Sequence, residues 1–226
     1  MTPPVALVTG TSSGIGAAIC RSLLDAGFRV HGFDRAPTKL NDDRFHPVAV
    51  ELDDMAALRK AMADIAQVDV LVHAAGFMRV AALGEGDMQA AAAMWAVHVA
   101  AAMALAEHFA PGMQAGGRIV LIGSRTAAGA AGRSAYAASK AALTGLARSW
   151  AKELAPRGIT VNIIAPGATD TPMLADPQRG HVPPQRPPIG RFIMPEEVAA
   201  LATFLISPAA AAITGQTILI CGGASL

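Results

Sequence analysis

The chain contains a single tyrosine, Tyr136, and Lys140 follows it after one helical turn. Residues four positions apart lie on the same face of a helix, so the phenol and the ammonium would be neighbours. An isolated phenol has a pKa of about 10 and exchanges protons poorly at neutral pH. A cation beside it stabilises the phenolate and lowers that pKa, which would make Tyr136 a general acid and base. The alternative is that both are solvated residues on a helix surface.

A serine stands just after the apolar run Arg118–Ile122, which has the pattern of a buried strand. In open α/β sheets, ligands bind at the carboxyl ends of the strands, so Ser124 would face a ligand there. Tyr136 follows 12 positions later, on the next predicted helix. The sequence therefore predicts a proton-transfer site that combines Ser124, Tyr136 and Lys140.

A glycine-rich turn lies between the first apolar run and the first helical pattern. Gly10, Gly14 and Gly16 have the spacing G-x3-G-x-G. Glycines there let the backbone turn tightly and approach a pyrophosphate, whose charge is stabilised by the helix N-terminus. A glycine triplet alone also fits an ordinary tight turn, but a strand before it and a helix after it favour a dinucleotide site. The predicted contacts are Gly10, Thr11, Ser12, Ser13, Gly14, Ile15 and Gly16.

Asp34 follows the second predicted strand, 18 residues after Gly16. In dinucleotide-binding folds, an acid about 20 residues beyond the glycines binds the ribose hydroxyls of adenosine. Its carboxylate would also repel a 2′-phosphate, by on the order of 4 kcal/mol at an effective dielectric of about 20 and by less when solvated. Asp34 therefore favours NAD over NADP, whereas Arg35 could pair with a phosphate. The alternative is a solvated loop aspartate.

Short apolar runs alternate with longer helical patterns along the chain. The runs are rich in Val, Ile and Leu and mostly lack polar alternation, which is typical of strands buried on both faces of a parallel sheet. The predicted strands are Val5–Thr9, Phe28–Phe33, His46–Val50, Val70–Ala74, Arg118–Ile122, Thr160–Ala165 and Thr217–Cys221. The predicted helices lie near residues 15–26, 54–66, 87–110, 135–155 and 195–206. This order predicts an α/β fold: a single Rossmann-type domain over residues 1–226, with a doubly wound parallel sheet of about seven strands and helices on both faces.

The composition argues against several classes of function. The 226 residues include 18 basic and 17 acidic side chains, and aromatic residues make up 4%, so nothing indicates a nucleic acid or a membrane as partner. The alanine-rich run 90–106 is slightly shorter than the roughly 18 residues of a membrane-spanning helix, so we expect a core helix. The two cysteines have no metal-ligand spacing, and no metal is predicted. Reduced thiols and the lack of a signal-peptide pattern predict a cytoplasmic protein.

Taken together, these motifs resemble those of the classical short-chain dehydrogenase/reductase family, and the similarity extends over nearly the whole chain. “TGTSSGIG” is similar to the family's cofactor turn, and Ser124, Tyr136 and Lys140 are similar to its Ser…Tyr-x-x-x-Lys motif. “VNIIAPGATDT”, “GRFIMPEEVA” and “TGQTILICGG” resemble its later segments. The resemblance implies that Ser124 orients the substrate oxygen and that Tyr136 is the acid and base. It also implies that Lys140 lowers the tyrosine pKa and binds the cofactor ribose.

The resemblance further implies cofactor contacts outside the glycine turn, with hydride passing at C4 of the nicotinamide. These contacts are Asp34, Arg35, Glu51, Leu52, His73, Ala74, Ala75, Gly76, Tyr136, Lys140, Pro166, Gly167, Thr169 and Thr171.

The chain departs from the family pattern at some of these positions. His73 stands where an asparagine is common, Glu51 and Cys221 stand where aspartates are common, and the interval from Ser124 to the tyrosine is one residue shorter than usual. His98 aligns with the asparagine of the family's catalytic tetrad, whose backbone carbonyl holds a water linked to the lysine. We predict that His98 preserves this link and that the enzyme is active. The alternative is a core histidine without a catalytic role.

The predicted function is an NAD(H)-dependent oxidoreductase that interconverts a secondary alcohol and a ketone by hydride transfer. An alternative within the same class is an NADP-dependent 3-oxoacyl-thioester (acyl-carrier-protein) reductase. An alternative of another class is a catalytically silent cofactor-binding sensor or scaffold, which only the departure at His98 supports.

Two further expectations concern the surface. The proline-rich segment 173–194 is predicted to be a mobile loop that covers a small-molecule alcohol or ketone. Its Arg179, His181 and Arg186 could attract an anionic substrate or could be solvated. Alanine-rich faces on the two longest predicted helices would leave large apolar patches on a monomer, and the family resemblance implies a homotetramer.

Overall fold

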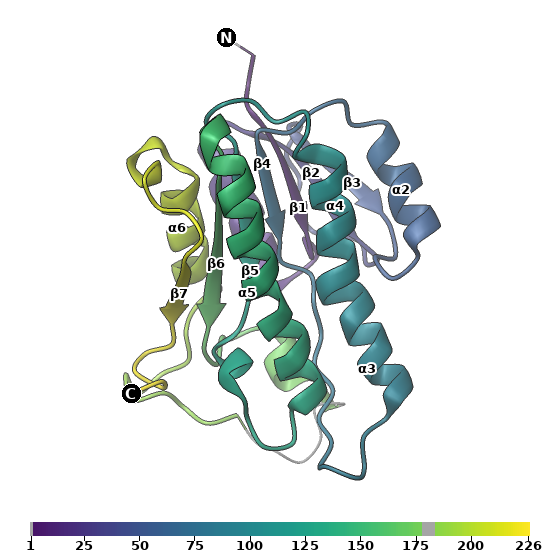
Figure 1. Ribbon diagram of the computed structural model, residues 1–226, viewed down its shortest axis with the longest axis vertical. Coiled ribbons are helices and arrows are strands. Elements are labelled where there is room, and N and C mark those ends of the chain that lie inside the picture. The colour runs from purple at the N-terminus through teal and green to yellow at the C-terminus, as the bar shows by residue number, and fades with distance from the viewer. Residues whose placement is uncertain (1, 178–183) are drawn as a thin grey trace.

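The computed structural model describes residues 2–177 and 184–226. Its centre is a seven-stranded sheet with the strand order β3-β2-β1-β4-β5-β6-β7 (Figure 1). The strands are β1 Val5–Thr9, β2 Arg29–Asp34, β3 Phe45–Ala49, β4 Val70–His73, β5 Arg118–Ile122, β6 Thr160–Pro166 and β7 Thr217–Ile220. All neighbouring strands are parallel, which confirms the predicted doubly wound sheet. The strand order reverses between β1 and β4, and ligands bind at such switch points.

Helices cover both faces of the sheet. They are α1 Gly14–Asp25, α2 Met55–Ala63, α3 Met88–Trp95, α4 Ala101–Phe109, α5 Ser134–Leu154 and α6 Pro195–Ile206. One buried cluster joins the sheet to α2, α4 and α5, which lie on the near face in Figure 1, and a second joins it to α1 and α6. Successive residues such as Leu7 and Val8 of β1 belong to opposite clusters. Burial on both faces therefore explains why the strands lack polar alternation.

Some predicted boundaries are wrong by small amounts. The second strand begins at Arg29 rather than at Phe28, because the backbone N–H of Phe28 donates to the carbonyl of Leu23 at 3.0 Å and closes the end of α1. Gly27, with φ of 87°, makes this left-handed turn possible, as its position after a helix indicates.

The third strand is likewise shifted by one residue, because the side chain of Phe45 is buried in the core next to α1. The helix predicted near residues 54–66 ends earlier, at Ala63, where Asp64 is the C-cap. The other strand and helix ends differ from the prediction by at most one residue.

The prediction of one helix over residues 87–110 is wrong in one respect, because this stretch is not α-helical throughout. A π-helical turn, η1 Ala96–Ala100, separates α3 from α4 and carries the buried His98. Each π turn holds one residue more than an α turn, and such turns are frequent at functional sites. The π turn therefore contains the position that aligns with the asparagine of the family's catalytic tetrad.

The stretch Met88–Phe109 is long and apolar enough, by length and composition, to cross a membrane, and the mean hydropathy over its most apolar 18 residues is 1.5. Its inner side chains, among them Leu105, pack into the cluster under α4 and α5. Its outer residues Trp95 and Met103 are 49% and 42% exposed. The stretch thus packs one side on the sheet, with 33% of its most apolar 18 residues buried, and it leaves an apolar outer face.

Candidate active site

A cleft of about 1210 Å³ runs along the carboxyl edge of the sheet. Its walls are the turn after β1, the ends of β2, β4, β5 and β6, and the start of α5. Pockets for drug-sized ligands measure about 300–1,000 Å³, so this cleft has room for a dinucleotide and a small substrate. All the predicted site residues line it except Thr11, His73 and His98.

The turn between β1 and α1 needs glycine because other backbone segments come close to it. Gly10 has a φ of 76°, and a Cβ there would lie 2.8 Å from the backbone of Ala75. A Cβ at Gly16 would overlap the carbonyl oxygen of Gly10. The N-terminus of α1 has neither a side-chain cap nor an acidic residue in its first turn. The N–H groups of that turn, whose residues line the cleft, are suited to the phosphates of a dinucleotide.

Asp34 lies at the end of β2, beside the glycine turn. One carboxylate oxygen accepts the N–H of Ser12 at 2.8 Å, and the other accepts the N–H of Ala36 at 2.9 Å. Arg35 is exposed and lines the same end of the cleft. The carboxylate is therefore held in one orientation, with lone pairs left to accept from hydroxyl groups of a ligand.

The structure brings Ser124, Tyr136 and Lys140 to the same part of the cleft. The hydroxyl oxygen of Ser124 accepts the N–H of Thr126 at 3.1 Å, which leaves its proton available to a ligand. Tyr136 is in the first turn of α5 and is mostly buried. Lys140 follows one turn later, also buried, as the predicted helical spacing requires.

Lys140 is tethered to the strand that leads to Ser124. Its Nζ donates to the carbonyl of Ile122, the last residue of β5, at 2.9 Å. Burial lowers the pKa of Lys140 from 10.5 to about 8. A Cβ at Gly76 would lie 3.4 Å from this Nζ and 2.9 Å from Nε2 of His98. Glycine at this position therefore leaves the space in which the ammonium and the imidazole approach the backbone.

His98 does not line the cleft, but it forms hydrogen bonds with Phe77, which lines the cleft, and with Ser139 of α5. Its Nε2 accepts the N–H of Phe77 at 3.1 Å, so the ring proton is on Nδ1, which donates to the hydroxyl of Ser139 at 2.8 Å. That hydroxyl donates in turn to the backbone carbonyl of Tyr136 at 2.8 Å. Burial, with a smaller effect of the Lys140 charge, holds the pKa of His98 well below its usual value. The imidazole is therefore neutral and links the π turn to the helix that carries Tyr136.

His73 is fully buried at the end of β4 and makes a different set of contacts. The hydroxyl oxygen of Thr9 accepts the N–H groups of Ala74 and Ala75, so its own proton goes to Nδ1 of His73 at 3.0 Å. Nε2 then donates to the carbonyl of Val97 in η1 at 3.0 Å. Burial lowers the pKa of His73 to about 3. The ring thus connects β1 to the π turn and is not brought into the cleft with the other predicted cofactor contacts.

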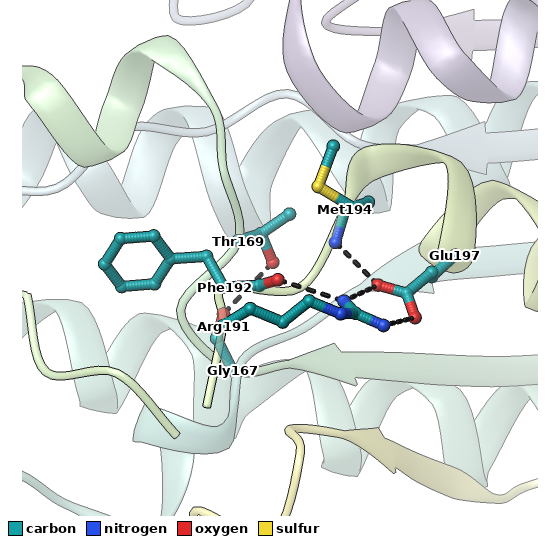
Figure 2. A network of polar contacts seen from close by, with 6 residues as sticks. All are labelled: Gly167, Thr169, Arg191, Phe192, Met194 and Glu197. Atoms are coloured by element: carbon teal, nitrogen blue, oxygen red, sulfur yellow. Dashed lines mark hydrogen bonds and ion pairs between the residues drawn. The ribbon is translucent and has the colours of Figure 1, made fainter. Parts of the chain in front are cut away.

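The segment predicted to cover the substrate is fixed at its far end. Figure 2 shows Arg191 facing Glu197 of α6, with two N–O contacts of 2.7 and 2.8 Å. Glu197 also accepts the N–H of Met194, and the arginine lowers the pKa of its carboxyl to about 2. A parallel bridge between Thr169 and Ile193 joins this end to the exit of β6.

The start of the same segment also has a polar contact across the cleft. Asp176 and Arg79, which follows β4, form an ion pair at 3.2 Å. Arg179 and His181 lie outside the described residues, and Arg186 does not line the cleft.

Sequence reasoning missed three arginines of the cleft wall. Arg79, Arg125 and Arg133 all line the substrate side, near Ser124 and Tyr136. The signal was present, because Arg125 directly follows the serine and Arg133 precedes the tyrosine by three positions.

The chain is similar in sequence and structure to proteins of known family. A family model described as “Enoyl-(Acyl carrier protein) reductase” matches residues 10–225. The 2,3-dihydro-2,3-dihydroxybenzoate dehydrogenase of Escherichia coli K12 is 35% identical over 241 residues, covering 97% of this chain and 96% of that protein. The 3-oxoacyl-(acyl-carrier-protein) reductase of Vibrio cholerae is 36% identical over 235 residues, with the same two coverages of 97% and 96%. A solved structure of a Serratia marcescens short-chain dehydrogenase/reductase variant has a TM-score of 0.86 and 34% identity, covering 99% of this chain and 98% of that chain.

These similarities extend from the glycine turn to the last strand, in sequence and in structure alike. They confirm the resemblance on which the cofactor and catalytic assignments rest. The chain belongs to the short-chain dehydrogenase/reductase family, whose members are oxidoreductases that act on CH–OH groups with NAD(P).

Proposed function

We propose that the protein is an NAD(H)-dependent oxidoreductase that interconverts a secondary alcohol and a ketone by hydride transfer. The observation that carries the proposal is that Tyr136 lines the cleft together with Ser124 and Lys140. When bound in the cleft, the nicotinamide supplies or accepts the hydride. The protein orients the substrate oxygen and moves its proton.

Ser124 and Tyr136, which both line the cleft, carry the hydroxyl groups that hold the substrate oxygen. Ser124 uses one lone pair to accept the N–H of Thr126, so its hydroxyl proton can be donated to the substrate oxygen. Tyr136 then donates its phenolic proton to that oxygen when a ketone is reduced, and it accepts the proton when an alcohol is oxidised. General acid–base catalysis of this kind contributes about 10²–10⁴-fold.

Lys140 supports the proton transfer electrostatically. With its pKa lowered to about 8, the ammonium remains largely charged at neutral pH. It lies one helical turn from the phenol, so its charge stabilises the phenolate that forms when Tyr136 gives up its proton. The hydrogen bond to Ile122 keeps the ammonium in place while this happens.

Asp34 supports NAD rather than NADP as the preferred cofactor. Two backbone N–H groups fix its carboxylate at the adenosine end of the cleft. Ribose hydroxyls can donate to a carboxylate, whereas a 2′-phosphate is repelled by it. Members of the family use either cofactor. The similarity to a 3-oxoacyl-(acyl-carrier-protein) reductase keeps the NADP-dependent alternative open, and Asp34 is the residue that argues against it.

A silent sensor or scaffold would not need the arrangement around His98. The neutral imidazole connects Phe77, on one wall of the cleft, to Ser139 and hence to the backbone of Tyr136 on the other. These bonds position the catalytic helix without using the asparagine of the family pattern. They support an active enzyme.

The outer face of α3 and α4 supports the proposal that the protein is a homotetramer. Trp95 and Met103 on this face are exposed in the single chain. Apolar faces of this kind are usually covered in an assembly. A cytoplasmic location is proposed on the sequence features alone.

The proposed function is tested by the oxidation of NADH in the presence of a panel of ketones and diketones. We expect turnover by the protein, and its loss in the Tyr136→Phe variant with binding of NADH retained. Binding of NADH by both proteins, without turnover on any member of the panel, would support the sensor or scaffold instead.

A further inference from the structure

The substrate side of the cleft carries an excess of positive charge. Three guanidinium groups line it, those of Arg79, Arg125 and Arg133. Arg79 is already neutralised, because it pairs with Asp176 and its guanidinium carbon lies 4.9 Å from the ring centroid of Phe77.

Within the described part of the chain, Arg125 and Arg133 have no acidic partner. Over residues 2–177 and 184–226, neither side chain forms an ion pair or a hydrogen bond. Nε of Arg133 is buried and lacks any acceptor within those ranges. A buried N–H without an acceptor costs free energy unless a ligand or water supplies one.

The acidic residue of the same wall, Asp87, forms an ion pair with neither arginine. Asp87 lines the cleft, but its carboxylate caps α3 by accepting the N–H of Gln89 at 2.8 Å. The first turn of α5, which begins one residue after Arg133, contains no acidic residue. Because the N-terminus of a helix carries positive charge of its own, the region stays electropositive.

The two arginines are close in the chain to the two residues that carry the hydroxyl groups of the site, and all four line the cleft. Arg125 is the residue after Ser124, and Arg133 is the N-cap of α5, three positions before Tyr136. The backbone that joins them packs on the segment after β4, where Gly132 accepts the N–H of Ala81 at 2.9 Å. A substrate held by both hydroxyl groups would lie in the cleft that Arg125 and Arg133 also line.

We propose that the substrate is a compact secondary alcohol or ketone that carries a carboxylate, and that Arg133, assisted by Arg125, binds this carboxylate. The inference rests on the proposed function, since it names the class of substrate for the same site. A guanidinium binds a carboxylate through two parallel N–H···O bonds, which fixes the orientation of the substrate as well as its affinity.

The first experiment measures equilibrium binding and needs no turnover. Cyclohexanecarboxylate and the neutral cyclohexanecarboxamide are titrated into the complex of the protein with NADH, with NADH fluorescence as the readout. We expect the carboxylate to bind more tightly, and Arg133→Gln to reduce this preference about 10- to 100-fold, equivalent to about 1.4 to 2.8 kcal/mol. Arg133→Lys should retain part of the preference for the carboxylate. Arg125→Gln should reduce this preference less than Arg133→Gln does.

The matched control is Arg148→Gln, the same substitution at an exposed arginine of α5 that does not line the cleft. It should leave the preference for the carboxylate as in the wild type. Thermal unfolding and NADH affinity are measured for every variant, to check that the fold and the cofactor site are intact. An equal affinity for carboxylate and amide in the wild type, or an unchanged preference in Arg133→Gln, overturns the proposal.

The second experiment separates this inference from the proposed function. Oxidation of 3-hydroxycyclohexanecarboxylate and of its amide is followed with NAD, and the ratio of the two kcat/KM values is compared across the same variants. Turnover of the amide at no disadvantage overturns the inference and leaves the proposed function standing. Tight, Arg133-dependent binding of cyclohexanecarboxylate without turnover of any alcohol supports the inference and counts against the proposed function.

Discussion

Nζ of Lys140 and the carbonyl oxygen of Ile122 lie 2.9 Å apart, so a charged side chain of α5 is bound to the last residue of β5. Because β5 leads directly to Ser124, this one hydrogen bond fixes the position of the lysine relative to the serine. Tyr136 lies on the same helix as Lys140, one turn before it. The three residues of the motif are thereby held by the backbone of two elements.

Replacing Tyr136 by Phe removes the proton-transfer group and keeps the ring. We expect kcat to fall by about 10²–10⁴-fold, which is the usual contribution of a general acid. NADH affinity, measured by fluorescence titration, should change little because the ring still fills its place beside Met78 and Met94. Full activity in this variant would remove the basis for assigning the site.

Replacing His98 by Asn should be far milder. The relay that the family resemblance implies uses a backbone carbonyl, which does not depend on the side chain, and asparagine can also both donate and accept. We expect kcat to change by less than about tenfold, or about 1.4 kcal/mol of activation free energy. A fall as large as that of Tyr136→Phe would mean that the imidazole itself takes part in the reaction.

Cofactor preference should depend on Asp34. The wild type is expected to use NADH with a higher kcat/KM than NADPH, because the carboxylate accepts from ribose hydroxyls and repels a 2′-phosphate. Asp34→Ala should lower kcat/KM for NADH and raise it for NADPH. The control is Asp43→Ala, at an exposed aspartate outside the cleft. Equal or better use of NADPH by the wild type would contradict the assignment.

Stability should rise with pH because of Lys140. Its pKa in the folded protein is about 8, below the ordinary 10.5, so the folded state binds fewer protons than the unfolded state between these two values. The free energy of unfolding then increases as pH rises through that window. Relative to Lys140→Met, which has no group to titrate, the gain should approach the order of 3 kcal/mol. Chemical denaturation of both proteins at several pH values checks this, and parallel pH curves would argue against it.

The fold was predictable from the sequence because each local signal agrees with the next. The run Arg118–Ile122 is apolar throughout, and the strand has those bounds in the structure. Tyr136 and Lys140 have helical spacing, and both lie on one helix. Asp34 stands at a strand end, and that strand is next to the glycine turn. These features depend on neighbours in the chain, which the sequence displays.

What could not be predicted depends on contacts between distant segments. The π turn around His98 has no local signature, because the residues there are those of an ordinary alanine-rich helix. The partners of His73 are 64 positions before it and 24 positions after it, at Thr9 and Val97. That Nε of Arg133 has no acceptor among the described residues becomes visible only when the wall of the cleft is assembled.

The two buried histidines carry their ring protons on opposite nitrogens, Nε2 in His73 and Nδ1 in His98, and burial holds both pKa values far below neutrality. Rings locked in this way are silent over the pH range in which histidine usually titrates. An inflection near pH 6.5 in the rate profile, which is ordinarily read as a catalytic histidine, would here have to come from the substrate or from another group.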